Sequence, residues 1–180
     1  MGAADDQRTG AVTREEIRAV WDGRLEPVPA QLVSPRLSVP TRSFLITIGL
    51  PYGSHWAEFF HDDRLSRPVV QRGREYLPIG ADDRGPLVIE PESDSMFHLL
   101  PEPYYVNADV SLFVYFHGLF VREIQRLDSV TEMEHDEFAD LVDDSIMGID
   151  RRMRDLDPSA CTTGSWWDCL LTEMVEQGHM

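Results

Sequence analysis

Two histidines and two aspartates between positions 55 and 63 are the side chains best suited to chemistry in this sequence. His55, His61, Asp62 and Asp63 carry the imidazole and carboxylate groups that bind zinc or act as general bases. Their spacing matches no defined metal motif, and the sequence has no P-loop, Gly-x-Ser-x-Gly or His-Glu-x-x-His. We therefore expect a solvated loop, with no catalytic residue, cofactor or metal. A small metal-dependent hydrolase using His55, His61 and Asp62 is the weakest alternative.

Asp82-Asp83-Arg84-Gly85 briefly resembles a calcium-binding loop. If Gly85 stood at the sixth loop position, Gly80 and Pro91 would take the first and last ligand positions, where carboxylates are needed. The segment is therefore predicted to be a hairpin turn. His117 lies inside a helical pattern and is expected to be packed rather than catalytic.

The strongest electrostatic feature is a run of eight carboxylates between positions 132 and 150, with no Arg or Lys among them. Surface helices usually gain from opposite charges four residues apart, but this run stacks like charges. Two interpretations stay open: the solvated face of an amphipathic helix, or a surface that attracts a basic partner. The candidate partner-binding residues are Glu132, Glu134, Asp136, Glu137, Asp140, Asp143 and Asp144 in this run, with Tyr52, Trp56 and Tyr104 as aromatic alternatives.

The composition supports a protein partner over a nucleic acid or a membrane. The chain of 180 residues has a net charge of −16, and all of its basic residues are Arg. Such a charge opposes binding to phosphates and to anionic lipid. Two cysteines without C-x-x-C spacing and an N-terminus without signal-peptide features predict a cytoplasmic protein.

The positioning elements begin with a helix over residues 14–22, introduced by a capping box at Thr13 and Glu16. Residues 27–40 contain four prolines and are predicted to be an extended connector. The run from Phe44 to Ile48 is predicted to be a strand. Residues 55–61 stay ambiguous, with a short helix as one interpretation.

Short apolar runs and turns then predict an antiparallel meander over 69–71, 75–81, 86–90, 95–100 and 104–106. Helical periodicity follows after Asn107, capped there or at Asp109, and again over 131–155 and 166–176. This order predicts an α+β fold in one domain over 13–180, after a flexible segment over 1–12. The expected core unites Trp21, Ile46, Ile48, Leu87, Ile89, Phe113, Phe116 and Phe120.

Four segments together resemble the SUKH superfamily, and within it the fourth branch of bacterial immunity proteins. They are residues 44–51, which end in Gly-Leu-Pro; residues 76–91, with an Ile-Gly pair before the turn; residues 95–113, with an Asn before the long helix; and residues 154–177, with Asp-Pro and a later Trp. The resemblance covers about 40–180.

This resemblance implies a central antiparallel sheet flanked by N-terminal and C-terminal helices. It also implies a protein that binds and blocks a toxin, often a nuclease or deaminase, and it supplies no catalytic residues. An acidic inhibitor suits a basic toxin, because opposite charges speed association. An adaptor or regulatory domain of the same fold is the main alternative.

Overall fold

A computed structural model describes residues 12–54, 56–130 and 134–178. The described N-terminal half contains, in chain order, α1 (Arg14–Trp21), β1 (Leu25–Glu26), the 3-10 turn η1 (Ala30–Leu32), α2 (Val39–Thr47), β2 (Leu50–Pro51), β3 (Glu58–Phe59), η2 (Asp63–Ser66), β4 (Val69–Gln71), β5 (Arg74–Ala81) and β6 (Pro86–Ile89). The remainder contains β7 (Met96–Leu99), β8 (Pro103–Asn107), α3 (Val110–Asp128), α4 (His135–Leu156), η3 (Pro158–Cys161) and α5 (Trp166–Gly178).

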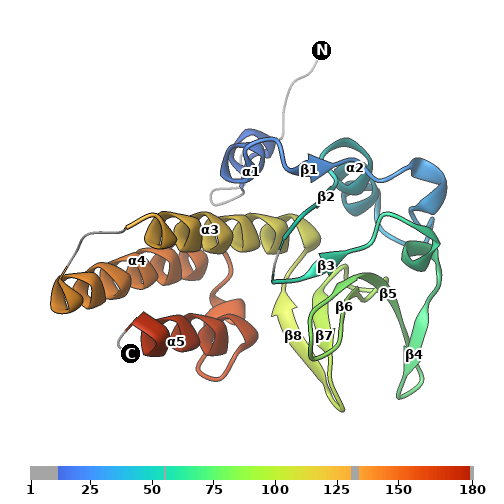
Figure 1. Cartoon of the computed structure of the whole chain (residues 1–180). Helices are drawn as coiled ribbons and strands as arrows, with labels where there is room; N and C mark the ends of the chain where they lie inside the picture. Colours follow the sequence, from blue (N-terminus) through green and yellow to red (C-terminus); the bar gives the residue numbers. More distant parts are fainter. Residues whose placement is uncertain (1–11, 55, 131–133, 179–180) are drawn as a thin grey trace.

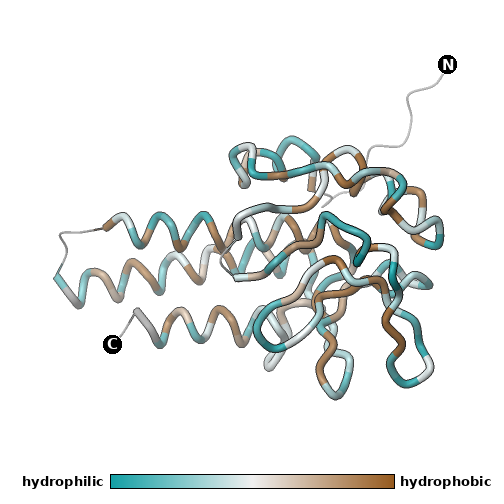
Figure 2. Tube along the Cα trace, turned by 45° about the vertical axis from the view of Figure 1, so that its right-hand side comes forward, coloured by the Kyte–Doolittle hydropathy of each residue, from teal (hydrophilic) through white to brown (hydrophobic). Residues whose placement is uncertain are grey.

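The central sheet is antiparallel and has the order β3-β5-β6-β7-β8, with β4 paired to the outer part of β5. Three consecutive hairpins build it, so the predicted meander and the α+β fold are confirmed. Helices α3, α4 and α5 lie alongside one another on one side of this sheet, and α1 and α2 lie above α3 (Figure 1). Hydrophobic and hydrophilic residues alternate along the helices, and hydrophobic stretches in the strands are separated by hydrophilic turns (Figure 2).

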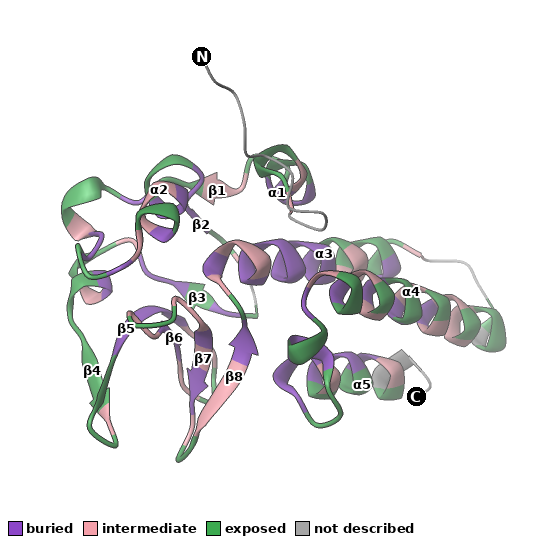
Figure 3. Ribbon diagram, turned by 180° about the vertical axis from the view of Figure 1, so that it is seen from behind, coloured by how far each residue is buried: buried purple, intermediate pink, exposed green. Residues whose placement is uncertain are grey.

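Helix α3 is the centre of the core. Asp109 caps its N-terminus by accepting hydrogen bonds from the backbone N–H groups of Ser111 and Leu112. The next helical turns are buried almost completely, whereas the outer face of α4 is exposed (Figure 3). Helix α1 packs against α3, and the indole N–H of Trp21 donates to the carbonyl of Val114 at 2.9 Å. Of the eight expected core residues, seven are buried.

The eighth, Ile46, is 37% exposed, because the prediction of a strand over residues 44–48 was wrong. The segment belongs to α2, which begins after Ser38, whose side chain accepts from the N–H of Thr41. Proline at the second helical position suits a helix start. Phe44 and Leu45 therefore share a buried helical face, and Ile46 points outward.

A buried polar network ties the sheet to the C-terminal helices. The carboxylate of Asp157 accepts hydrogen bonds from Tyr105 Oη, Asn107 Nδ2 and the N–H of Ala108, at 3.2, 3.2 and 2.9 Å. Asn107 Oδ1 in turn accepts from the indole N–H of Trp167 at 2.9 Å. The Asn, the Asp-Pro and a Trp of the family resemblance thus meet in one structural cluster that holds β8 against η3 and α5.

The short strand β3 lies unusually close to β5. A Cβ atom at Gly80 would lie 2.5 Å from the carbonyl oxygen of Glu58, so only glycine permits this pairing. The register of β5 against β6 also shifts between Pro78 and Gly80. Together these features fix the position of β3 against β5. Tyr52 and Trp56, two of the aromatic residues singled out from the sequence, come just before β3 in the chain.

Candidate functional site

An aromatic and acidic face around Trp56

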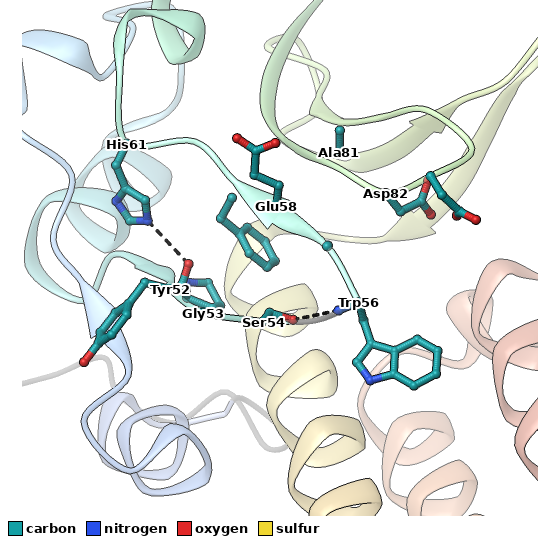
Figure 4. Close-up of a pocket in the computed structure, with 12 residues that line it drawn as sticks. Tyr52, Gly53, Ser54, Trp56, Glu58, His61, Ala81 and Asp82 are labelled. Carbon is teal, nitrogen blue, oxygen red and sulfur yellow. Dashed lines mark hydrogen bonds between the residues drawn. The ribbon is translucent and has the colours of Figure 1, made fainter.

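Residues 52–54 and 56–57, on either side of a position outside the described residues, contact α3 through Ser54 and Trp56. Ser54 Oγ lies 2.8 Å from Nε2 of His117, and it also accepts from the backbone N–H of Trp56 at 3.3 Å. The Trp56 ring meets Phe120 edge to face, with centroids 5.2 Å apart. Trp56 nevertheless keeps 36% of its surface exposed, and Tyr52 keeps 50%. The segment therefore holds the Trp56 ring against α3 and leaves the side chain of Tyr52 exposed at its other end (Figure 4).

The Ser54–His117 pair joins the loop to the buried core. His117 is fully buried and stacked on Trp21, and burial lowers its pKa to about 3. Its Nδ1 has no hydrogen-bond partner among the described residues, so we assign the ring proton to Nε2, where it has an acceptor. In this tautomer Ser54 Oγ accepts from His117, and the ring presents no free lone pair to the serine hydroxyl. The pair positions the loop, and His117 is packed, as the sequence predicts.

Three pockets meet at Trp56, and we call them together the Trp56 groove. The first, of about 560 Å³, lies over the loop and is bordered by Tyr52, Glu58 and Asp82 (Figure 4). The second, of about 430 Å³, lies between Trp56 and the Trp166 side of α5. The third, of about 340 Å³, is mainly apolar and is lined by Trp56, Ile124, Leu127, Asp128, Phe138, Val142 and Met174.

Carboxylates dominate the charged residues of the Trp56 groove. The described lining includes one arginine, Arg84, and five acidic residues: Glu58, Asp82, Asp83, Asp128 and Glu173. Burial alone would raise the pKa of Asp82, but the adjacent imidazole of His98 and the hydrogen bonds from the N–H groups of Arg84 and Gly85 outweigh it and lower that pKa to about 2. Asp82 therefore stays ionised at neutral pH, with His98 Nε2 2.9 Å from its Oδ1.

The histidine and aspartate cluster is divided among separate partners. His55 lies outside the described residues. His61 Nε2 lies 3.4 Å from the carbonyl oxygen of Pro51, and Asp62 accepts from the backbone N–H and the Nε of Arg64, each at 2.9 Å. The hydrogen bonds from the Arg64 side chain and backbone lower the pKa of Asp62. Within the described parts of the chain, no group of three or more His, Cys, Asp or Glu residues could hold a metal ion.

The described part of the acidic run begins at Glu134 and continues along α4, whose Phe138 and Val142 line the third pocket together with Trp56. Its surroundings are less uniformly acidic than its sequence. Glu134, Asp136, Glu137, Asp140 and Asp144 are exposed, Asp143 is half-buried, and Glu132 lies outside the described residues. Helix α3 brings arginines alongside: Arg122 and Arg126 border the same pocket as Asp144. Arg126 also donates to Ser145 Oγ at 2.5 Å. The acidic surface is therefore confined mainly to the N-terminal end of α4.

The structure joins Tyr52 and Trp56 but leaves Tyr104 apart. Tyr104 lies on β8, near Cys169 and Asp168 of α5, and it is absent from the described lining of the Trp56 groove. Burial, with Cys169 and Asp168 nearby, raises the pKa of Tyr104. Sequence reasoning missed Asp83, Trp166 and Glu173, which come from the β5–β6 turn and from α5. The exposed turn was visible in the sequence; its proximity to α5 was not.

The fold is α+β, and the exposed face around Trp56 combines aromatic and acidic residues. Residues 12–173 match the family described as SUKH-4 immunity protein. The chain belongs to this family, which confirms the resemblance seen in the sequence, and the family supports a role in neutralising toxins. No curated protein matches the chain, and no solved structure does. No helix in the described ranges has the length and apolar character needed to cross a bilayer.

Proposed function

We propose that this protein neutralises a basic toxin, of the nuclease or deaminase type, by binding it stoichiometrically through the Trp56 groove. The main support is the meeting of three pockets at one anchored, partly exposed tryptophan. Interface energy concentrates in such aromatic anchors near the centre of a contact. Both cysteines are free, and we place the protein in the cytoplasm, where thiols stay reduced.

The acidic end of α4 has a separate task in this proposal. Glu134, Asp136, Glu137 and Asp140 are exposed, so their charge acts across solvent and is screened by salt. Such peripheral charges raise the rate of association more than they slow dissociation. We therefore assign the capture of the toxin to α4 and its retention to the Trp56 groove.

The proposal is tested with a toxin encoded beside the gene for this protein. Co-expression should restore growth of cells that produce the toxin, and the purified pair should form a complex with one copy of each chain. Toxin activity that continues at saturating concentrations of this protein would refute the immunity role. A toxin that is covalently altered after release from the complex would indicate catalysis in place of binding.

Two variants separate the two surfaces. Trp56→Ala should weaken the complex by roughly 30-fold or more, chiefly through faster dissociation. Asp136→Asn combined with Asp140→Asn should slow association at low salt, and the effect should shrink near 0.15 M, where the Debye length is about 8 Å. If neither change alters binding, both placements of the contact surface are wrong, although the immunity role stands on the growth assay.

A further inference from the structure

We infer that the Trp56 groove recognises a two-part element of the partner: an arginine side chain in its acidic pocket and an apolar side chain in the neighbouring apolar pocket. This inference rests on the proposed function and specifies the chemistry of the partner. The acidic pocket is the one between Trp56 and Trp166, and the apolar pocket is the one that contains Phe138 and Met174. The two pockets share Trp56 as a common wall.

The residues that line the acidic pocket are of the types that bind a guanidinium group, namely tryptophan and carboxylate side chains. Trp56, which is 36% exposed, lines the pocket, and the mostly buried Trp166 borders it. Asp83 and Glu173 supply carboxylates, one from the β5–β6 turn and one from α5. A cation is attracted both to the face of an indole ring and to the carboxylates, and a planar guanidinium satisfies both interactions at once. Lysine offers a compact charge and fits this arrangement less well.

The carboxylates of this pocket are not all neutralised within the protein. Glu173 has no ion pair among the described residues, and the side chain of Asp83 is exposed, with its nearest cation, Arg84 Nε, at 4.0 Å. Asp82, by contrast, is buried against His98 and also contacts Arg84. Asp83 and Glu173 are therefore the groups available to an incoming cation.

Arg84 is the competing cation. It borders the same pocket and lies 3.5 Å from Asp82, so its charge opposes the entry of a second guanidinium. Removing this charge should favour a cationic partner. This expectation gives the inference a test by gain of affinity, which a damaged or unfolded variant cannot imitate.

The apolar pocket provides the second part of the recognition. Ile124, Leu127, Phe138, Val142 and Met174 line it, with one carboxylate, Asp128, among the described residues at its border. The flexible, unbranched side chain of methionine adapts to apolar groups of different shapes. An arginine adjacent to a leucine or a similar residue would therefore span both pockets, with Trp56 between its two side chains.

The test uses two capped tripeptides, acetyl-Leu-Arg-Leu-amide and the same peptide with citrulline in place of arginine. Citrulline keeps the shape of arginine but carries no charge. Binding is followed by NMR at the indole N–H of Trp56, which is assigned with the Trp56→Phe variant. The arginine peptide should bind about twofold to tenfold more tightly than the citrulline peptide, and less so at high salt.

Variants then locate the recognition. Glu173→Gln should weaken binding of the arginine peptide by about twofold to fivefold, as expected for a partly exposed ion pair. Arg84→Gln should strengthen it by a similar factor. Glu92→Gln is the matched control, because Glu92 is exposed on the β6–β7 turn and lines none of the three pockets. The Glu92→Gln variant should bind the arginine peptide with the same affinity as the wild type.

Equal binding of the two peptides would overturn the inference, as would weaker binding to Arg84→Gln or the absence of any shift at Trp56. These results leave the proposed function untouched, because protection of cells from the toxin is measured separately. Conversely, failure of the growth assay with intact peptide recognition would remove the immunity role and leave the recognition chemistry.

Discussion

The close packing of α1 on α3 at Gly118 leads to a sharp prediction about stability. A Cβ atom at this position would lie 2.6 Å from Val20 Cγ2 and 2.7 Å from Trp21 Nε1. Both neighbours are buried, and the branched side chain of valine has one preferred rotamer in a helix, so neither can move into solvent. Gly118→Ala must therefore push α1 away from α3.

Three contributions set the size of the effect. Overpacking of a buried contact costs about 1–3 kcal/mol. Displacing Trp21 also weakens its hydrogen bond to the carbonyl of Val114, for about 1 kcal/mol more. The higher helix propensity of alanine acts in the opposite direction and adds about 1 kcal/mol to the free energy of unfolding. We expect Gly118→Ala to lower the free energy of unfolding by about 1–3 kcal/mol in total.

Gly148 supplies a matched control inside another helix. It lies on α4 and is exposed, and a Cβ atom added there would have no neighbouring atom within 4 Å. Gly148→Ala should raise the free energy of unfolding by about 0.5–1 kcal/mol through helix propensity alone. The two substitutions are chemically identical, so opposite signs would isolate the contact with α1.

Urea denaturation followed by tryptophan fluorescence measures both variants. The midpoint should fall for Gly118→Ala and rise for Gly148→Ala, with an unchanged slope that shows the same surface exposed on unfolding. The reasoning would be refuted if Gly118→Ala proved as stable as the wild type, or if both variants shifted in the same direction.

Three further predictions concern the core, the polar network and pH. Phe116→Ala should cost about 3–5 kcal/mol, because the ring is buried; an unchanged denaturation midpoint would contradict its place in the core. Asn107→Leu should cost about 2–4 kcal/mol, because it leaves Asp157 short of a donor and Trp167 without an acceptor; calorimetry showing wild-type stability would contradict the network. His117 has a folded-state pKa of about 3, below the unfolded value, so its contribution is present above about pH 6.5 and is lost as pH falls toward 3. His117→Phe should therefore flatten the fall of stability across that range, and an unaltered slope in acid titration would contradict the burial of a neutral imidazole.

The sheet and the three long helices were predictable because their signals are local. Short apolar runs separated by turn residues produced the hairpins of β5 to β8, and the stripe of α3 repeats at helical spacing over many residues. The capping box at Thr13 and Glu16 also formed as the sequence predicts. In each case one segment contains the whole signal.

Helix α2 was not predicted, because its local sequence signal favours a strand. Its β-branched residues Ile46 and Thr47 favour a strand, and the helix start at Ser38 lies within a segment rich in proline. Yet Thr41, Phe44 and Leu45 are buried at helical spacing. Packing against the rest of the fold overrides propensity here, and so short a segment does not carry enough pattern to reveal it.

The candidate site was predictable only in part, for a geometric reason. Tyr52 and Trp56 are close in sequence and also share a pocket, whereas Glu173 reaches the Trp56 groove from α5. No periodicity or spacing relates residues that lie so far apart along the chain. The acidic run was clear in the sequence, but the arginines of α3 that border it, Arg122 and Arg126, became visible only in three dimensions.

Helix α5 contributes residues both to the buried polar network and to the Trp56 groove. Its Trp167 closes the buried network, and its Trp166 and Glu173 border the groove. A partner that binds only the native form stabilises it by mass action, and every local opening that destroys the binding site becomes rarer. The indole hydrogen of Trp167, held at 2.9 Å from Asn107 Oδ1, should therefore exchange with deuterated water more slowly in the complex. The exchange rate of this buried indole would then report whether the Trp56 groove is occupied.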